Sequence, residues 1–375
     1  MIANEWTASG DKPGWRLHNL ITSLSARRRL PLRYLTCARA MRRENMAHDM
    51  TVVTGAGGFI GGHLVAALLN EGHPVRAVDL KPFDTWYQLF PDAENLQLDL
   101  RTAENCLTAT RGAAQIFNLA ADMGGMGFIE NHKAECMLSV LVNTQMLLAS
   151  RQVATSRFFF SSSACVYAAG KQVNPENPGL KEEDAYPAMP EDGYGWEKLF
   201  SERMCRHFTE DFGLPTRVGR YHNVYGPHGT YDGGREKAPA AICRKVAEAK
   251  LSGDNEIEIW GDGEQARSFT YIDDCITGTL KLMESDVTEP LNIGSSQLVT
   301  INKLVDTVEQ IAGTELKRRY ELNAALGVRG RNSDNTLVLE HLGWEPSIPL
   351  EVGLERTYAW IYDQIVCSRG KKVRF

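Results

Sequence analysis

The sequence lacks the features of a metal centre, a disulfide framework or a membrane anchor. Its eight cysteines are scattered between Cys37 and Cys367, with no C-x-x-C pair and no cysteine–histidine cluster at metal-ligand spacing. We therefore expect no bound metal, and reduced thiols as in a cytoplasmic protein. No apolar run approaches the roughly 20 residues that a helix needs to span a bilayer, so no membrane association is expected.

Positive charge is scarce after the first 49 residues. The formal net charge of the chain is −6, but residues 1–49 hold nine Lys or Arg and four Asp or Glu, so the remainder carries about −11. Residues 50–375, with this net negative charge, would repel the phosphate backbone of a nucleic acid. No nucleic-acid partner is therefore expected. The Arg-rich start shows no core pattern. We interpret it as a disordered or spurious extension, with a transit peptide or translation from an upstream start as alternatives.

From residue 50 onward, short apolar strands alternate with helical stretches. Alternation of this kind favours an α/β fold, a Rossmann-type doubly wound parallel sheet. Beyond about residue 220 the pattern breaks into Gly- and Pro-rich segments. We expect one domain over 50–220, with returning segments near 261–295, and a smaller C-terminal domain over 221–375. Strands are expected at 51–54, 75–78, 96–98, 115–119, 158–161 and 256–260, and helices at 61–69, 137–151 and 239–250.

A glycine-rich turn separates the first expected strand from the first expected helix. Gly55, Gly58 and Gly61 have G-x-x-G-x-x-G spacing, with Phe59 and Ile60 inside the turn. Glycine is needed there because the turn is tight and a pyrophosphate must approach the backbone closely. The amino-terminal end of the helix then meets the negative charge of the phosphates. The turn therefore predicts a dinucleotide site in the first domain.

Two aspartates refine the identity of that dinucleotide. Asp79 ends the second expected strand, 21 residues after Gly58. A carboxylate at this position can bind both ribose hydroxyls and would repel a 2′-phosphate, so NAD is favoured over NADP. Asp99, after the third strand, is a candidate contact to the adenine.

A tyrosine and a lysine stand four residues apart in a segment expected to be helical. Tyr194 and Lys198 would share one face of that helix and reach one site. A tyrosine of ordinary pKa, about 10, is a poor base at neutral pH. A neighbouring ammonium and a cationic nicotinamide would favour the phenolate and lower this pKa. Ser163, at the end of an upstream strand, would hydrogen-bond the hydroxyl that is oxidised.

These three motifs resemble the extended short-chain dehydrogenase/reductase family, which includes sugar-nucleotide epimerases and dehydratases. Further segments, spread over roughly residues 50–365, are similar to the GDP-mannose 3,5-epimerases within that family. They are AADMGGMGF at 120–128, SACVY at 163–167, GREKAP at 234–239 and GVRGRNSD at 327–334.

The resemblance implies a GDP-sugar substrate and a transient 4-ketone. Tyr194 would take the proton of the carbon-4 hydroxyl while NAD is reduced, and the ketone would acidify the hydrogens on carbons 3 and 5. Cys165 is implied as the base and Lys237 as the acid on the opposite face. Nearby positive charge is expected to depress the pKa of Cys165. Inversion at carbon 5 alone gives an L-gulose product, and inversion at both carbons gives L-galactose.

The resemblance also implies substrate contacts and a homodimer. Asn223 is a candidate diphosphate contact, and a diphosphate requires fixed cationic donors nearby. The candidate phosphate partners are Lys245, Arg267 and Arg331; the candidates lining the sugar pocket are Gly124, Gly125 and Met126; and further implied contacts are Ser163, Ala164, Cys165, Glu236, Lys237, Ala238 and Gln265.

Three other functions compete with this interpretation. A 4,6-dehydratase of the same fold needs an Asp-Glu pair where this chain has Ala164 and Cys165, which argues strongly against dehydration. A 4-epimerase of another nucleotide-sugar needs neither Cys165 nor Lys237 and is the alternative enzyme. A non-catalytic NAD-binding regulator would have no need of Tyr194, Lys198, Ser163 and Cys165.

Overall fold

The computed structural model describes residues 49–372, with gaps at 177 and 325–326. Residues 1–48, for which we weighed a disordered or spurious extension and a transit peptide, lie outside the described residues. The described chain belongs to one compact unit.

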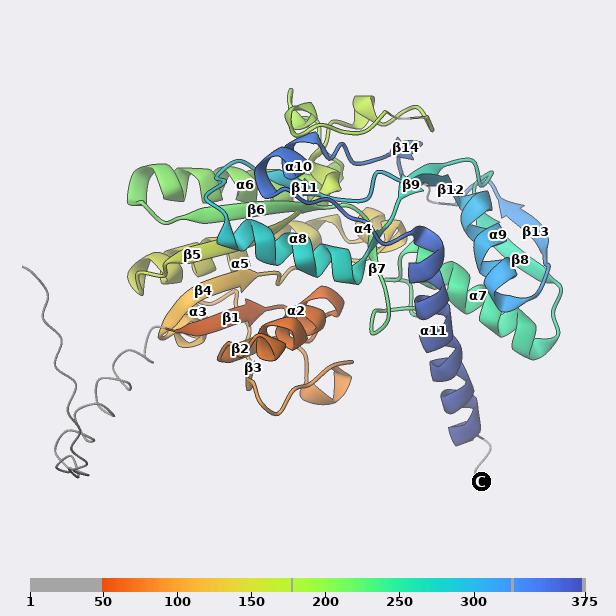
Figure 1. Ribbon diagram of the computed structural model, residues 1–375, viewed down its shortest axis with the longest axis horizontal. Coiled ribbons are helices and arrows are strands. Elements are labelled where there is room, and N and C mark those ends of the chain that lie inside the picture. Colours follow the sequence, from red (N-terminus) through yellow and green to blue (C-terminus); the bar gives the residue numbers. More distant parts are fainter. Residues whose placement is uncertain (1–48, 177, 325–326, 373–375) are drawn as a thin grey trace, which may run out of the picture. The chain divides into compact units, whose positions relative to one another are not determined.

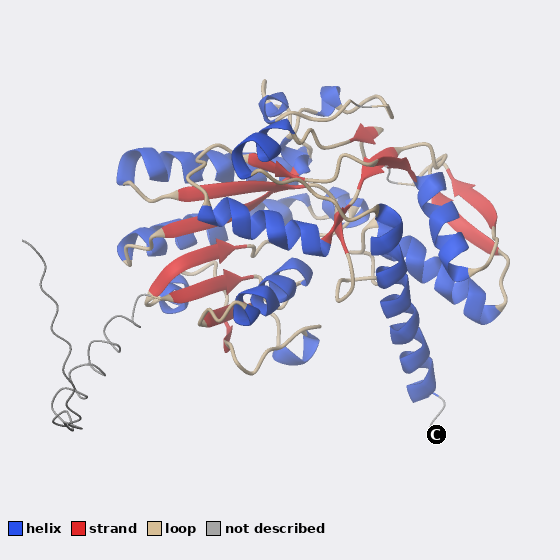
Figure 2. Ribbon diagram, in the orientation of Figure 1, coloured by secondary structure: helices blue, strands red, loops and turns tan. Residues whose placement is uncertain are grey.

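A seven-stranded parallel sheet forms the centre of this unit (Figures 1 and 2). Its strand order is β11-β6-β5-β4-β1-β2-β3, and every neighbouring pair is parallel. The order reverses between β1 and β4, where ligands bind in doubly wound sheets. The predicted fold class is confirmed. The strands are β1 (Met50–Thr54), β2 (Val75–Asp79), β3 (Glu94–Gln97), β4 (Ala113–Asn118), β5 (Arg157–Ser163), β6 (Thr216–Tyr221) and β11 (Leu291–Ile293).

Helices cover both faces of the sheet. Successive side chains of a strand point to opposite faces, so a buried strand must be apolar on both sides. In β5, Phe158 and Phe160 belong to the core on one face, whereas Phe159 belongs to the core on the other. The first core contains side chains of α3 (Ala103–Thr110), α5 (Lys133–Gln152) and α6 (Asp192–Phe212), and the second contains side chains of α2 (Phe59–Asn70) and α8 (Ile272–Glu284).

The rest of the chain adds small sheets and three packed helices. Helices α7, α9 and α11 pack against one another, and β8 pairs with β13, β10 with β7, and β9 with both β12 and β14. These elements are α7 (Ala238–Ser252), α9 (Ile301–Ala312), α11 (Leu350–Lys372), β7 (Val224–Tyr225), β8 (Glu256–Trp260), β9 (Ala266–Ser268), β10 (Thr270–Tyr271), β12 (Leu298–Thr300), β13 (Lys317–Glu321) and β14 (Gly330–Arg331). Short helices are α4 (Met126–Asn131), α10 (Thr336–Leu342), η2 (Phe83–Thr85), η3 (Ala164–Val166), η4 (Ala169–Lys171) and η5 (Glu182–Ala185).

The predicted elements are present, with shifts at their ends. Helix α2 begins at Phe59 rather than at residue 61, so the last residues of the glycine turn are already helical. Strand β3 spans 94–97 rather than 96–98, because it lies at the edge of the sheet and has polar ends that an apolar-run criterion misses. Helix α8 and strand β11 both lie within 261–295 and return to the main sheet. The division into two domains stays a prediction.

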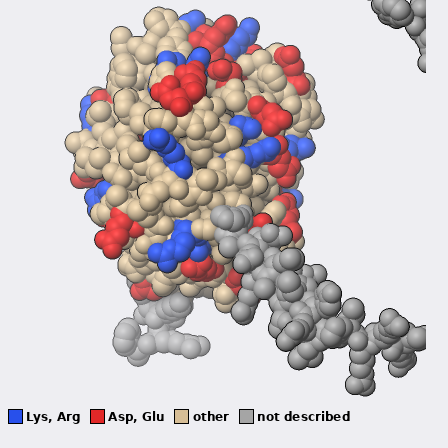
Figure 3. Space-filling view, turned by 90° about the vertical axis from the view of Figure 1, so that its left-hand side faces the viewer, with Lys and Arg blue, Asp and Glu red and all other residues tan. Residues whose placement is uncertain are grey.

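The surface carries both signs of charge. Figure 3 shows Lys and Arg interspersed with Asp and Glu on one face, without a continuous area of either sign. Among residues 49–372, no helix combines the length and apolar character that crossing a bilayer requires.

Candidate active site

The glycine turn forms a cradle at the start of α2. Gly55 has a φ of +71°, which strains any residue with a side chain, and a Cβ on Gly61 would lie 2.1 Å from the Gly55 carbonyl oxygen. The N-cap residue, Gly58, has no side chain to cap the helix. The first N–H groups of α2 are therefore available to an anion such as a pyrophosphate.

Asp79 lies beside this cradle and Asp99 lies farther along the chain. The Asp79 carboxylate accepts hydrogen bonds from the backbone N–H of Gly57 at 3.0 Å and of Lys81 at 2.9 Å. A carboxylate has about four acceptor positions, so two ribose hydroxyls still fit. The carboxylate of Asp99 is bound by the Arg101 guanidinium, with its closest N–O distance at 2.6 Å. Its contact to the adenine stays a prediction.

Helix α6 brings Tyr194 and Lys198 together, as their spacing predicts. Both side chains are buried, with exposed fractions of 5% and 2%. The Lys198 Nζ lies 5.5 Å from the centroid of the Tyr194 ring and 4.7 Å from that of Phe160. It also lies 3.5 Å from the Glu197 carboxylate, which helps to balance its buried charge.

The phenol of Tyr194 lies beside Ser163. Burial, with Cys165 and Glu197, raises the pKa of Tyr194 well above its ordinary value, and hydrogen bonding with Ser163 acts in the opposite direction. The expectation of a depressed tyrosine pKa is therefore wrong for the protein alone, because desolvation of the phenolate is the largest effect.

Cys165 lies directly after β5, in the 3-10 helix η3, and is almost fully buried. Its backbone N–H donates to the Ser163 hydroxyl at 3.2 Å. The Arg331 guanidinium reaches its sulfur, with Nη1 3.6 Å from Sγ. Arg331 also donates to the Gln172 side chain at 2.7 Å and forms an ion pair with Glu191. A thiol that loses its proton here would have a buried cation beside it.

The pKa of Cys165 is raised, which corrects the sequence-based expectation. Burial is the main cause and the Glu191 carboxylate is the second, while Arg331 acts in the opposite direction. The prediction considered positive charge near the thiol but not Glu191, which neutralises part of it. Glu191 immediately precedes α6, three residues before Tyr194, and its backbone N–H donates to the Cys165 carbonyl at 3.0 Å.

Lys237 is the N-cap residue of α7 and is partly buried. Burial lowers its pKa, Cys165 raises it and Arg331 lowers it further. The influence of Cys165 on the pKa of Lys237 means that the thiol lies within electrostatic reach of the ammonium. The resemblance implies these two groups as base and acid, and these roles stay a prediction.

Two arginines stand opposite each other on paired strands. Arg267 of β9 is the register partner of Arg331 of β14. Like charges placed directly opposite are destabilising, and burial together with Arg331 lowers the pKa of Arg267. Arg267 also donates to the Ala266 carbonyl at 2.9 Å. This concentration of positive charge suits an anion, as a diphosphate site requires.

Three other candidate substrate contacts lie in the second half of the chain, Asn223 and Gln265 on loops and Lys245 within α7. Asn223 has a φ of +41° and donates to the Ser268 carbonyl at 3.0 Å. Gln265 is buried and donates to the Trp260 carbonyl at 2.8 Å, and its Oε1 has no hydrogen-bond partner among the described residues. Lys245 donates to the Glu258 carbonyl at 2.9 Å, and burial lowers its pKa.

The loops around Gly125 and Lys237 face each other. A Cβ on Gly125 would lie 2.4 Å from the Glu236 carbonyl oxygen, so only glycine allows this approach. The Glu236 carboxylate accepts from the Gly234 N–H at 2.7 Å. Gly124 packs against Phe128, Ala238 begins α7, and Ala164 is buried beside Cys165 in η3.

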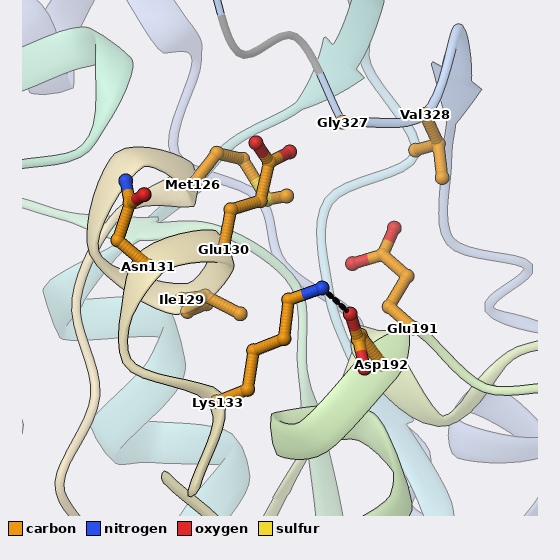
Figure 4. A pocket seen from close by; sticks show the side chains of 9 residues that line it. All are labelled: Met126, Ile129, Glu130, Asn131, Lys133, Glu191, Asp192, Gly327 and Val328. Carbon is orange, nitrogen blue, oxygen red and sulfur yellow. Dashed lines mark ion pairs between the residues drawn. The ribbon is translucent and has the colours of Figure 1, made fainter. Parts of the chain in front are cut away.

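A cavity of about 430 Å³ opens next to these groups (Figure 4). Met126 and Glu191 stand on opposite walls, and an ion pair joins Lys133 to Asp192, two exposed residues of the lining. Glu191 thus separates the cavity from the buried guanidinium of Arg331. The lining residues are Met126, Ile129, Glu130, Asn131, Lys133, Glu191, Asp192, Gly327 and Val328.

The strand order and this strand-end site define an enzyme of the dinucleotide-dependent, doubly wound class. The profile of the NAD dependent epimerase/dehydratase family matches residues 51–294, and the chain belongs to this family. Its cofactor is accordingly NAD, as Asp79 predicts.

Two relatives within this family are similar to the chain over most of its length. GDP-mannose 3,5-epimerase 1 of Oryza sativa subsp. japonica is 49% identical over 314 residues, which are 84% of this chain and 82% of the rice protein. GDP-mannose 3,5-epimerase of Arabidopsis thaliana is 48% identical over 321 residues, 85% of this chain and 84% of that protein. The resemblance to GDP-mannose 3,5-epimerases is confirmed.

Solved structures agree on the fold. UDP-glucose 4-epimerase from Thermotoga maritima, with UDP-glucose, superimposes with a TM-score of 0.76 at 27% identity, covering 84% of this chain and 99% of that one. UDP-glucuronic acid 4-epimerase from Bacillus cereus, in complex with UDP-glucuronic acid and NAD, gives a TM-score of 0.71 at 26% identity, with the same coverage.

Proposed function

We propose that this protein is an NAD-dependent isomerase that epimerises GDP-D-mannose at carbons 3 and 5 through a transient 4-keto intermediate. The observation that carries the proposal is the placement of Cys165. Its sulfur lies against Arg331, within electrostatic reach of Lys237, and next to the Ser163–Tyr194 pair. The likeness to the rice and Arabidopsis enzymes supports GDP-mannose as the substrate.

Oxidation at carbon 4 uses Tyr194, Lys198 and Ser163. NAD held at the cradle of Gly55 and Gly61 would supply the hydride acceptor for carbon 4 and the donor for the final reduction. Tyr194 takes the hydroxyl proton, and Ser163, beside the phenol, orients that hydroxyl. The nearby Lys198 ammonium stabilises the phenolate as it forms, which offsets part of the desolvation that raises the pKa of Tyr194.

Proton transfer at carbons 3 and 5 uses Cys165, Arg331 and Lys237. Cys165 rests as a thiol because burial raises its pKa, and it becomes the base after its proton passes to solvent, with Arg331 stabilising the thiolate. The thiolate removes the hydrogen next to the ketone. Lys237, whose pKa is lowered, gives up its proton readily to the opposite face. Reduction of the ketone then restores the hydroxyl.

The GDP portion is assigned to the paired arginines. Arg267 of β9 and Arg331 of β14 are register partners and so place two cations side by side. Asn223 donates to the carbonyl of Ser268, the residue that follows Arg267 on β9. A diphosphate would relieve the repulsion between the guanidiniums. Gln265 has a buried oxygen that no described residue satisfies, so a donor group of the substrate could bind there.

The test is incubation of the purified protein with GDP-mannose in deuterated water, followed by mass and proton NMR analysis. Deuterium at carbons 3 and 5 in L-configured products is expected, and the ratio of the two products shows which carbon inverts. Conversion at carbon 4 without deuterium would instead identify a 4-epimerase. Absence of any reaction would favour another nucleotide-sugar or a non-catalytic NAD-binding regulator.

We further propose that the protein is a homodimer formed through α5 and α6. These helices pack together, and their outer faces expose large apolar side chains at helical spacing. A second copy would cover both helices in a four-helix arrangement. The molar mass from light scattering should be twice that of the chain, and a Leu141→Glu, Phe200→Glu variant should be monomeric. The exposed side chains are Met137, Leu138, Leu141 and Leu148 on α5, and Trp196, Phe200 and Phe212 on α6.

A cytoplasmic location belongs to the same proposal. The seven cysteines of the described residues are free, which is compatible with a reducing compartment. Fractionation of cells that express the full chain tests this, and recovery with a membrane or organelle fraction would contradict it.

A further inference from the structure

Arg235 joins the two loops that border the sugar pocket. One loop follows β4 and contains Asp122, Met123 and Gly125. The other precedes α7 and contains Arg235 and, two residues later, Lys237. The backbone N–H of Gly125 donates to the Arg235 carbonyl at 3.0 Å, so the loops are already paired through their main chains.

The guanidinium of Arg235 adds three contacts across the same junction. Its Nη1 lies 2.7 Å from an Asp122 carboxylate oxygen and 3.2 Å from the Met123 carbonyl oxygen. Its central carbon lies 3.7 Å from the centroid of the Phe128 ring, which stacks on its other side with His132 at a centroid distance of 4.2 Å. A flat cation with several donors can satisfy a carboxylate, a carbonyl and a ring at once, whereas a lysine cannot.

The chain on the amino-terminal side of Arg235 gives little support of its own. Gly233 and Gly234 have φ values of +89° and +85°, and the space where a Cβ would stand is open at both. On the other side, Lys237 is the N-cap residue of α7 and Pro239 occupies its first turn. Arg235 therefore stands between a two-glycine hinge and a rigid helix start.

We propose that Arg235 is a positioning residue for epimerisation: by binding Asp122, Met123 and Phe128 it holds Lys237 in line with the face of the sugar that receives the proton. The inference rests on the proposed function. No hydrogen bond, ion pair or cation–ring contact joins Arg235 to Tyr194, Lys198 or Ser163 among the described residues, so oxidation at carbon 4 should depend on it much less than inversion does. Loss of the guanidinium should therefore separate the two halves of the reaction.

The experiment measures both halves on the full-length protein. Mixing with GDP-mannose and following NADH absorbance reports oxidation at carbon 4. NMR in deuterated water reports two deuterated species, inverted product and recovered substrate that was deprotonated by Cys165 and reprotonated on the same face. For Arg235→Ala we expect the NADH transient to stay within about threefold of the wild type. The ratio of inverted to recovered deuterated species should fall about tenfold or more.

Two further variants provide the comparison. Arg235→Lys keeps the charge but not the planar contacts and should give a ratio between those of the wild type and Arg235→Ala. Arg356→Ala is the matched control, because Arg356 is similarly exposed, pairs with Asp273 at 3.4 Å and lies over the Tyr271 ring at 5.5 Å, on an element that carries no group of the site. This control should keep both readouts at wild-type values.

Each outcome bears on the proposal. An unchanged ratio in Arg235→Ala would overturn the positioning role, and so would an NADH transient that falls as much as the inversion, since that indicates general damage to the site. If Arg235→Ala does not fold, Arg235→Lys decides between the same outcomes. Failure of the wild-type protein to oxidise GDP-mannose or to exchange deuterium counts against the proposed function itself.

Discussion

The groups assigned to oxidation and those assigned to proton transfer are held by different parts of the fold. Ser163 ends a strand of the parallel sheet, and Tyr194 and Lys198 share the buried face of α6. Arg331 lies on a two-residue strand, Lys237 on a helix N-cap, and both are surrounded by other charges. Regular elements fix the first set through backbone geometry, while the second set depends on electrostatic balance among loops. The first set should be held rigidly in place, and the second should be easier to tune by changing neighbouring charges.

The largest expected effect is loss of the oxidation step. Tyr194→Phe keeps the ring but removes the proton acceptor, and we expect turnover of GDP-mannose to fall about 10³- to 10⁴-fold, with NADH formation lost in parallel. Absorbance at 340 nm and product NMR measure both. Tyr320→Phe, in which the hydroxyl bonded to Asn302 on the surface is removed, is the control. A Tyr194→Phe protein that still reduces NAD would contradict the role of Tyr194 in the oxidation step.

A smaller loss, confined to the second half of the reaction, is expected for Cys165→Ser. A serine hydroxyl is a much weaker acid than a thiol, so inversion at carbons 3 and 5 should fall about 10²- to 10³-fold while NADH still forms. Cys205→Ser is a matched control, since Cys205 is also buried and has a polar partner in Asn143. Full epimerase activity in Cys165→Ser would remove the thiol from the mechanism.

The contrast between the two regions extends to stability. Arg220 of β6 and Glu202 of α6 form a buried ion pair, with N–O distances of 2.9 and 2.8 Å. Removing one partner leaves the other charge unpaired, so Arg220→Ala should lower the free energy of unfolding by about 3–5 kcal/mol. The exposed pair of Arg319 with Glu256 is the comparison, and Arg319→Ala should lower the free energy of unfolding far less than Arg220→Ala. Urea denaturation measures both, and similar losses would contradict the expected rigidity of the sheet region.

The smallest expected effect is a shift in pH dependence. Glu191 raises the pKa of Cys165, so Glu191→Gln should lower that pKa and increase the thiolate population at neutral pH. The rising limb of the pH profile for inversion should then move to lower pH, and the rate at neutral pH should increase severalfold. Asp192→Asn, which removes the next carboxylate of the cavity wall, should leave this limb in place. A shift to higher pH would show that the carboxylate assists deprotonation.

The two regions also differed in how far the sequence could predict them. Gly55, Asp79, Tyr194 and Lys198 could be placed from spacing alone, because a strand–turn–helix unit and an i, i+4 pair have fixed geometries. The parallel sheet followed from the alternation of apolar strands and helices. These are local regularities, and local regularities are visible in a sequence.

The proton-transfer groups could not be derived in this way. Cys165 and Arg331 are 166 residues apart, and the sequence predicted Arg331 as a phosphate partner without indicating its contact with the thiol. The effect of Glu191 on the thiol was missed because it arises from burial and from a carboxylate brought close by folding, neither of which has a fixed spacing. Even the sign of the pKa shift of Cys165 was wrong for this reason.

The return of β11 to the main sheet has a consequence for synthesis of the protein. Strand β11 pairs with β6, yet about 70 residues separate the two strands in the chain. While the ribosome is making that stretch, β6 remains an unpaired edge with free backbone donors and acceptors, which other chains can bind. A fragment that stops near residue 220 should therefore aggregate, whereas one that continues past Ile293 has closed that edge.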